Sequence, residues 1–250
     1  MIERRHDGPV TILQLQHGKA SALDVELLGA LESELAEAEA AGQAIVITGT
    51  RSIFSAGVDL FRVLDEGDAY LASFLPALDA ALLRLFTFPR PAVAAINGHA
   101  MAGGWILACA CDYRVMTLGA GKAALPELQV GVAFPPIAIE AVRFATPAAH
   151  LHALVFAGRE YTGEEALRAG LVEEAVEADS VVDRAVAVAK AMARTPVAAY
   201  RLTKDQLRAP NVARVAAATA ARAAVREQWS GDDTATIIRS YLDRVVGKGR

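Results

Sequence analysis

The chain has 250 residues, of which 54% are hydrophobic and 22% are charged, and its formal net charge is −4. This composition excludes a disordered chain, and the weak negative charge excludes a general electrostatic attraction to nucleic acid or to an anionic membrane. The first ten residues lack the apolar segment of a secretory signal, and no stretch offers roughly 18 uninterrupted apolar residues. We therefore expect a soluble, cytoplasmic protein that binds neither nucleic acid nor membrane.

The beginning of the chain alternates between strand and helix patterns. Residues 9–16 alternate apolar and polar side chains as a half-buried strand does, and the helical spacing that follows begins at Asp24 and ends at Gly42. Residues 44–48 (AIVIT) then form a short buried strand, and a glycine-bearing turn and a new helix come after it. This order is typical of α/β proteins.

The same order repeats further along the chain. Residues 65–68 form an acidic turn, and helical spacing then continues as far as the prolines of residues 89–91, which end it. Two more strands are predicted at residues 92–96 and 112–117, separated by a helix that begins near Gly103. The repeat predicts an α/β fold in which helices and strands lie in layers.

From residue 134 onward the patterns are almost wholly helical. Thr162 and Glu165 have the spacing of a capping box at the start of a helix. We place a boundary at the Thr-Pro step, which divides a core at residues 1–195 from a C-terminal helical region at residues 196–250. The apolar faces of that region are of the kind that meets a partner subunit.

Cys109 and Cys111 are the two cysteines of the sequence, and both lie in an apolar run. Their surroundings predict buried, reduced thiols. Two cysteines without a nearby histidine make a poor zinc site, so no metal is expected. Asp112, which follows directly, is expected to anchor the next strand.

Two loops combine a glycine with the start of a helix. They are FSAGVDL at residues 54–60 and AMAGGWILACACD at residues 100–112. The first N–H groups of a helix have no partner within the helix, and its dipole favours negative charge there. Two such groups aimed at one carbonyl oxygen form an oxyanion hole. The alternative is a pair of ordinary turns, in which Asp59 caps its helix and the glycines allow close packing.

These segments resemble a known family. FSAGVDL, NGHAMAGGWILACACDYRV (residues 97–115) and PELQVGV (residues 126–132) are similar to the motifs of the enoyl-CoA hydratase/isomerase superfamily, also called the crotonase family, and the similarity extends from about Gly8 to the C-terminus. The resemblance implies a spiral of ββα units with a C-terminal helical region that forms a homotrimer, often paired into a hexamer. It also implies an acyl-CoA substrate, whose coenzyme A is part of the substrate and not a separate cofactor.

The resemblance also implies roles for individual residues. The backbone N–H groups of Val58 and Gly103 are the expected oxyanion donors, and side chains at Gly103 and Gly104 would obstruct the thioester or crowd the loop. Basic side chains such as Lys19 and Arg51 are candidates to meet the phosphates of coenzyme A. The expected substrate-binding residues are Lys19, Ala20, Ala22, Ala56, Gly57, Asp59, Leu60, Gly104, Ile106 and Leu128.

The catalytic carboxylates distinguish the reactions of the family. Its hydratases use two glutamates, one of them three residues after the donor glycine, and this chain has Ile106 there. Position 106 is one helical turn beyond Gly103, so its side chain is expected to line the same pocket, and isoleucine holds no water. The second glutamate is present as Glu127.

A single carboxylate suits one reaction of the family. It removes a proton from C2 of a 3-enoyl-CoA and returns it to C4, as in the Δ3,Δ2-enoyl-CoA isomerases that this chain resembles. Apolar neighbours such as Ile106 and Leu128 are expected to raise the pKa of Glu127.

Two other interpretations stay open. Hydration, dehydration or another lyase reaction would need a second acidic group from another segment. A catalytically silent acyl-CoA-binding protein would explain the missing glutamate at Ile106. The sequence does not decide the acyl chain, the pathway, or trimer against hexamer.

Overall fold

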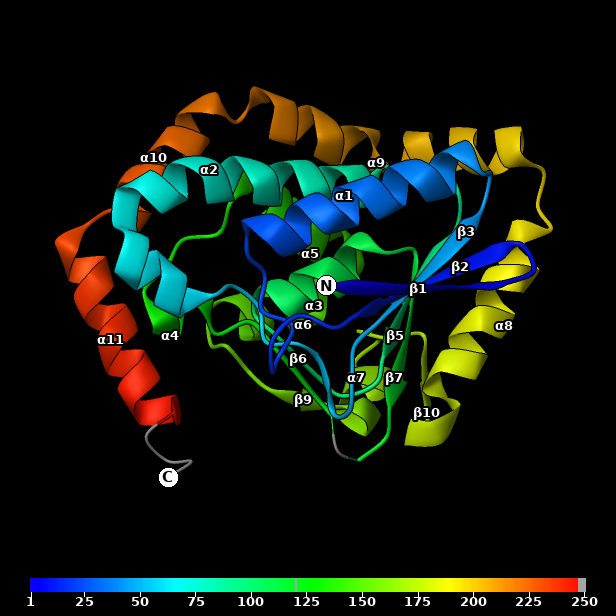
Figure 1. The fold of residues 1–250 in the computed structure, drawn as a ribbon, viewed down its shortest axis with the longest axis horizontal. Coiled ribbons are helices and arrows are strands. Elements are labelled where there is room, and N and C mark those ends of the chain that lie inside the picture. Colours follow the sequence, from blue (N-terminus) through cyan, green and yellow to red (C-terminus); the bar gives the residue numbers. More distant parts are fainter. Residues whose placement is uncertain (120, 247–250) are drawn as a thin grey trace.

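We describe a computed structural model of the protein, which covers residues 1–119 and 121–246. Its larger sheet has six strands, shown near the centre and right of Figure 1. In spatial order they are β1 (Ile2–Asp7), β2 (Val10–Leu15), β3 (Ala44–Thr48), β5 (Ala92–Ile96), β7 (Tyr113–Thr117) and β10 (Glu174–Val176). The β1–β2 pair is antiparallel and the other neighbours are parallel.

A second sheet has four short strands. In spatial order they are β4 (Ile53–Ser55), β6 (His99–Met101), β8 (Lys122–Ala124) and β9 (Tyr161–Thr162). The chain visits the two sheets alternately and then forms a helix, in the order β3-β4-α2, β5-β6-α3 and β7-β8-α4. The expected crotonase-like spiral of ββα units is therefore confirmed.

The helices cover both faces of the larger sheet. They are α1 (Val25–Ala40), α2 (Leu60–Phe86), α3 (Gly103–Ala110), α4 (Glu127–Val130), α5 (Pro136–Ala145), α6 (Ala148–Val155), α7 (Gly163–Arg168), α8 (Val181–Ala193), α9 (Val197–Ala217), α10 (Thr219–Trp229) and α11 (Asp232–Val246), with a short 3₁₀ helix at Ala178–Ser180. Asp24 caps α1 through the N–H of Leu27, and Thr162 and Glu165 form the expected capping box of α7.

Strand β3 explains how one apolar run serves two layers. Side chains alternate across a strand, so Ala44 and Val46 pack against α8, whereas Ile45 and Ile47 join the main core on the opposite face. All five residues of the strand are buried. A continuous apolar run is what a parallel strand covered on both faces requires.

Several elements differ from the sequence prediction. Strands β9 and β10 lie in the part of the chain predicted to be almost wholly helical, because they are too short to carry a visible alternation. The predicted acidic turn is instead the N-terminal part of α2, in which Asp65 and Glu66 are helical and the break is confined to Gly67 at φ 60°.

By length and composition alone, α2 is the one helix of the described residues that is long and apolar enough to cross a membrane. Half of the relevant window is buried inside the protein. There α2 packs against α1 and α5, so its apolar character is explained by its place in the core.

A buried ion cluster fixes α9 to the core. Asp112 accepts hydrogen bonds from the N–H of Ala92 (2.8 Å), the hydroxyl of Tyr200 (2.8 Å) and Nζ of Lys204 (2.9 Å), and its other oxygen lies 2.9 Å from Arg208. Asp112 therefore anchors the start of β7, as expected, and also holds α9. The boundary proposed at residue 195 falls between α8 and α9 and stays a prediction, and residues 247–250 of the C-terminal region lie outside the described residues.

The cysteines are located as the sequence predicts. Cys109 and Cys111 are buried free thiols, and burial raises the pKa of each to about 12.

Candidate active site

The loop between β4 and α2 is held in place by the segment that precedes α1. The N–H of Ala56 donates to the carbonyl of Ala20 (3.0 Å), that of Leu23 donates to Gly57 (2.7 Å), and that of Asp59 donates to Leu23 (3.0 Å). Two of these bonds use the carbonyl of Gly57 and the N–H of Asp59, which flank the N–H of Val58. Within the described residues, the N–H of Val58 donates no hydrogen bond.

The loop that precedes α3 packs directly on this first loop. A Cβ atom on Gly57 would lie 2.7 Å from Cβ of Ala102 and 2.9 Å from the backbone nitrogen of Gly103, so no side chain fits there. Gly57 also has φ +85°, which glycine adopts without strain. Like that of Val58, the N–H of Gly103 donates no hydrogen bond within the described residues. Two unpartnered amides thus come from two touching loops.

The second glycine of the GG pair serves packing. A Cβ atom on Gly104 would lie 2.4 Å from the carbonyl oxygen of Ser55 in β4. Gly104 therefore lets α3 approach the second sheet, and it is not among the residues that line the pocket. We expected glycine at this position either because a side chain would obstruct the thioester or because it would crowd the loop. At position 104 the second reason applies.

Ala102 carries backbone strain at the entrance to α3. Its φ is 50° and its ψ is −127°, a region that L-residues rarely occupy. The N–H of Ala102 donates to the carbonyl of Ala124 in β8 (2.9 Å), which holds the residue in this conformation. The turn orients the next amide, that of Gly103, at the first position of the helix, where no partner within the helix exists.

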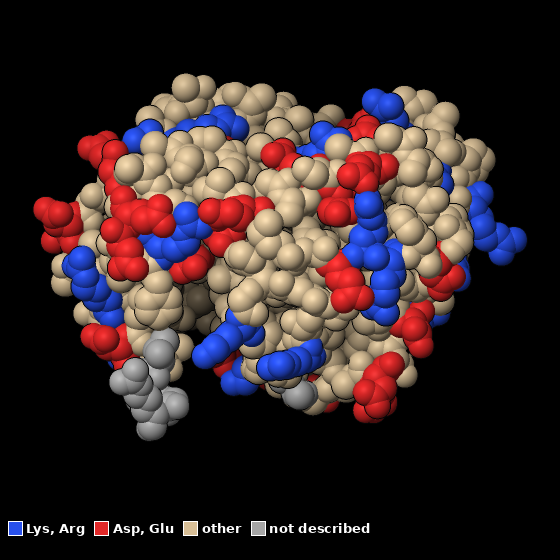
Figure 2. Space-filling view, viewed as in Figure 1, with Lys and Arg blue, Asp and Glu red and all other residues tan. Residues whose placement is uncertain are grey.

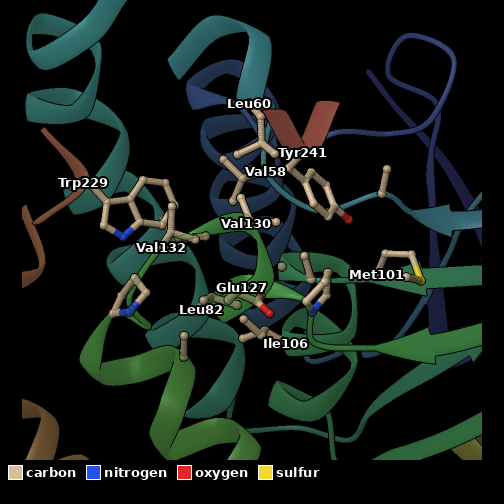
Figure 3. A pocket seen from close by; sticks show the side chains of 17 residues that line it. Val58, Leu60, Leu82, Met101, Ile106, Glu127, Val130, Val132, Trp229 and Tyr241 are labelled. Carbon is tan, nitrogen blue, oxygen red and sulfur yellow. The ribbon is translucent and has the colours of Figure 1, made fainter. Parts of the chain in front are cut away.

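A mainly apolar pocket lies beside these two loops. Figure 3 shows its side chains, and Figure 2 shows a hollow between the α11 side of the molecule and its centre, with basic side chains along the edge. The residues that line the pocket are Ala56, Val58, Leu60, Leu78, Leu82, Met101, Ala102, Gly103, Ile106, Pro126, Glu127, Val130, Val132, Pro135, Ala138, Trp229 and Tyr241.

Glu127 is the one carboxylate that lines this pocket among the described residues. It is the first residue of the short helix α4 and is only 6% exposed. Its Oε2 atom is buried and has no hydrogen-bond partner in the part of the chain that the structure describes. In Figure 3 the carboxylate lies close to Ile106.

Burial raises the pKa of Glu127 to about 8, and its own backbone N–H opposes the shift only in part. A carboxyl group of this kind exchanges its proton near neutral pH, which a general acid–base catalyst requires. Its position and its pKa together make it a candidate catalytic group.

The structure brings six of the thirteen predicted site residues together in one pocket. Gly103, Ile106 and Glu127 line one pocket, joined by Ala56, Val58 and Leu60 from the other loop. Asp59 caps α2 by accepting from the N–H groups of Phe61 and Arg62, as its alternative interpretation predicted. Lys19, Ala20 and Ala22 belong to the segment beside the first loop and do not line the pocket.

The expectation for Leu128 is wrong. Its side chain is 46% exposed and does not line the pocket. Successive side chains of a helix point in different directions, so the turn that aims Glu127 inward directs its neighbour outward. The apolar surroundings of the carboxylate come instead from residues such as Ile106, Val130 and Leu82.

Sequence reasoning missed the part of the wall that comes from the C-terminal helices. Trp229, at the end of α10, is 4% exposed and donates from Nε1 to the carbonyl of Ala133 (2.8 Å). Tyr241 enters the pocket from α11. The amphipathic pattern of these helices indicated a buried face, but nothing in the pattern indicated which cavity that face would line.

Comparison with known proteins agrees with this geometry. Residues 6–244 match the family model described as enoyl-CoA hydratase/isomerase. Carnitinyl-CoA dehydratase from Salmonella paratyphi A is 32% identical over 206 residues, which cover 81% of this chain and 78% of that protein.

Two similar proteins with solved structures are named for different activities. Human mitochondrial Δ3-Δ2-enoyl-CoA isomerase has a TM-score of 0.91 and 27% identity, with 99% of this chain and 98% of that chain covered. A probable enoyl-CoA hydratase from Mycobacterium tuberculosis has a TM-score of 0.83 and 27% identity, covering 90% and 97% of the two chains.

Proposed function

The chain belongs to the enoyl-CoA hydratase/isomerase family, and we propose that it converts 3-enoyl-CoA thioesters into 2-enoyl-CoA thioesters. The observation that carries this proposal is that Glu127 is the one carboxylate lining the pocket within the part of the chain that the structure describes, and that it faces apolar side chains including Ile106. Moving a double bond by one carbon needs one group that takes a proton and returns it, and it needs no water. A mainly apolar pocket with one base among the described residues meets that requirement.

Glu127 acts in two steps. Its carboxylate removes a proton from C2, and the electrons of the broken C–H bond move through the conjugated system to the thioester oxygen, which gives a dienolate. The protonated glutamate then returns the proton to C4, so that the double bond lies between C2 and C3. The carboxylate is regenerated, and the product has the same atoms as the substrate.

The backbone amides of Val58 and Gly103 stabilise the negative charge of this intermediate. Both lack an acceptor within the described residues, and their loops touch at Gly57. The amide of Gly103 adds the favourable field at the start of α3. Loss of one such donor in other enzymes costs about 10²–10³ in rate.

Coenzyme A is expected to lie outside the pocket along the segment at residues 19–22 and the loop at residues 56–60. Hydrogen bonds join these two segments, and basic side chains border the hollow in Figure 2. Lys19 and Arg51 are the candidates to meet the phosphates. The assembly proposed for the protein is a homotrimer or a hexamer, with the C-terminal helical region as its contact.

The decisive experiment follows conjugation of 3-hexenoyl-CoA by ultraviolet absorbance. We expect conversion by the wild type and a loss of at least about 10³-fold in kcat for Glu127→Gln, which keeps the shape of the side chain and removes the base. Glu227→Gln, an exposed carboxylate on α10, is the matched control and should retain wild-type activity. Conversion that does not depend on Glu127 would refute the mechanism.

Dehydration of a 3-hydroxyacyl-CoA is the second candidate function. The relatives named carnitinyl-CoA dehydratase support it, since they are 32% identical to this chain. This reaction needs a second polar group to hold the departing water, and Ile106 does not provide one. Release of a 2-enoyl-CoA from 3-hydroxyhexanoyl-CoA would favour it.

A further inference from the structure

Trp229 lies on the side of the pocket away from the loop that carries Gly103. In Figure 3, Trp229 and Met101 are on opposite sides of Glu127, and Met101 comes two positions before Gly103 in the chain. An acyl chain whose thioester meets the amide of Gly103 therefore runs past the carboxylate toward the indole ring. Trp229 is the last residue of α10 and is buried, so its ring forms part of the wall.

The indole ring is fixed from two directions. Its N–H donates to the carbonyl of Ala133, in the loop that precedes α5 (2.8 Å), and its ring centroid lies 6.4 Å from that of Phe74 on α2. Phe74 is itself fully buried and stacks on Tyr70 at 5.4 Å. Moving the indole aside for a longer chain would break the hydrogen bond and leave a buried donor without a partner, which is costly.

A second cavity lies behind this wall. It is formed by the same three elements, α2, the start of α5 and α10, and Pro135 lines both cavities. On α2, Leu78 lines the acyl pocket, and Leu75, about one turn earlier, lines the second cavity. On α10, Val225 lines the second cavity one turn before Trp229, and a helical side chain leans over the turn that precedes it. The indole ring therefore covers the passage between the two cavities.

The two cavities differ in size. The acyl pocket encloses about 70 Å³ and the second cavity about 490 Å³. A water-sized group needs about 10–15 Å³ on this scale, so the acyl pocket holds about five to seven such groups. A methylene group is of similar size, and acyl groups of about six to eight carbons have that many carbons beyond the thioester carbonyl. A longer chain has room only where the second cavity is open to it.

We propose that Trp229 is a specificity-determining residue, which ends the acyl pocket and restricts the protein to acyl chains of about six to eight carbons. The proposal rests on the proposed function, since it takes the chain to extend from Glu127 toward α10. It assigns the limit on chain length to the C-terminal helices. Removing the ring should join the two cavities, and the tail of a longer chain should then enter the second one, whose lining is mainly apolar.

The test measures kcat/KM for 3-enoyl-CoA thioesters of six, eight, twelve and fourteen carbons. In the wild type we expect a fall of at least about tenfold from eight to twelve carbons, the size expected from forcing methylene groups into a filled space. In Trp229→Leu the ratio of the twelve-carbon to the six-carbon value should rise at least about 60-fold over wild type, since each newly buried methylene group contributes about fourfold and three suffice.

A second variant and a matched control accompany this measurement. Trp229→Phe keeps a smaller ring in the passage and should raise the same ratio about fourfold, the contribution of one methylene group. It tests the proposal even where the leucine variant is unstable. Trp105→Leu removes the other tryptophan of the chain, which is also buried but lines neither cavity, so it should leave the ratio as in the wild type. Calorimetric titration with saturated hexanoyl-CoA and dodecanoyl-CoA repeats the comparison without the reaction.

The outcomes separate this proposal from the proposed function. A wild type that isomerises six-carbon and fourteen-carbon substrates equally well, or a ratio that neither Trp229 variant changes, would overturn the role of Trp229 and leave the proposed function standing. Binding that selects chain length through Trp229, without isomerisation of any chain, would do the reverse.

Discussion

Replacing Glu127 by glutamine should make the protein more stable relative to wild type as the pH rises. The pKa of Glu127 moves from 4.5 to about 8 on folding because the carboxyl group is buried. Between these values the unfolded chain has released the proton that the folded protein still holds, so the free energy of unfolding of the wild type falls with rising pH. At about 1.4 kcal/mol per pKa unit, wild type loses roughly 2.5 kcal/mol between about pH 6 and pH 9 through this group.

Urea denaturation of wild type and Glu127→Gln at several pH values across this range measures the effect. The difference between their free energies of unfolding should grow in favour of the variant up to about pH 8. It should then level off, because Glu127 is ionised in both the folded and the unfolded wild type. Glu227→Gln, an exposed position, should stay parallel to the wild type. Parallel curves for Glu127→Gln would refute the burial argument, because they would mean that the carboxyl group titrates alike in both states.

Two further substitutions test the loops and the helix anchor. Gly57→Ala should lower kcat/KM for isomerisation about 100-fold, since its Cβ would lie 2.9 Å from the nitrogen of Gly103 and would displace a proposed oxyanion donor. Gly67→Ala has the same kind of backbone (φ +60°) but nothing within 4 Å, so it should cost about 1 kcal/mol of stability and leave the rate within about twofold; equal rate losses would contradict the loop geometry. Asp112→Asn should lower the urea stability by about 3–5 kcal/mol, because it leaves Lys204 buried without its charge partner, and a loss below about 1 kcal/mol would disprove this anchor role.

Most of the long elements of the first half could be predicted because local patterns decide them, whereas β1 was missed because its side chains are almost all polar and exposed. The sequence places the strand at residues 44–48 and the helix that opens at Asp24 correctly, since a largely apolar run and an aspartate at a helix start have a physical meaning of their own. It misses β4 and β6, which have three residues each and exist because a second sheet is there to pair with them. Strands of that length carry too few positions for a periodicity to appear.

The candidate site could also be predicted in part, because some of its residues belong to local patterns. Gly57, Gly103 and Glu127 belong to short motifs whose chemistry is local, and the resemblance to a family aligned them. The expectation that Leu128 lies beside Glu127 in the pocket was wrong, because the direction of a side chain depends on the turn of α4. Tyr241 was missed because it is about 114 positions from Glu127 in the chain, and only the docking of α11 brings them together.

The C-terminal helices therefore form part of the pocket wall as well as stabilising the fold. The side-chain amide of Gln228 donates to the carbonyl of Gly131 (2.7 Å) and accepts from the N–H of Ala133 (2.9 Å), which fixes the end of α10 beside the loop that follows α4. Ile237 of α11 packs on the same loop, where a Cβ on Gly131 would lie 2.7 Å from it. Because Glu127 begins α4, the contacts that dock α10 and α11 on the following loop also hold the wall that Trp229 and Tyr241 add to the pocket of the carboxylate. The acyl chains that this pocket accepts should thus depend on how firmly these helices close it, and not on the loops of the first half alone.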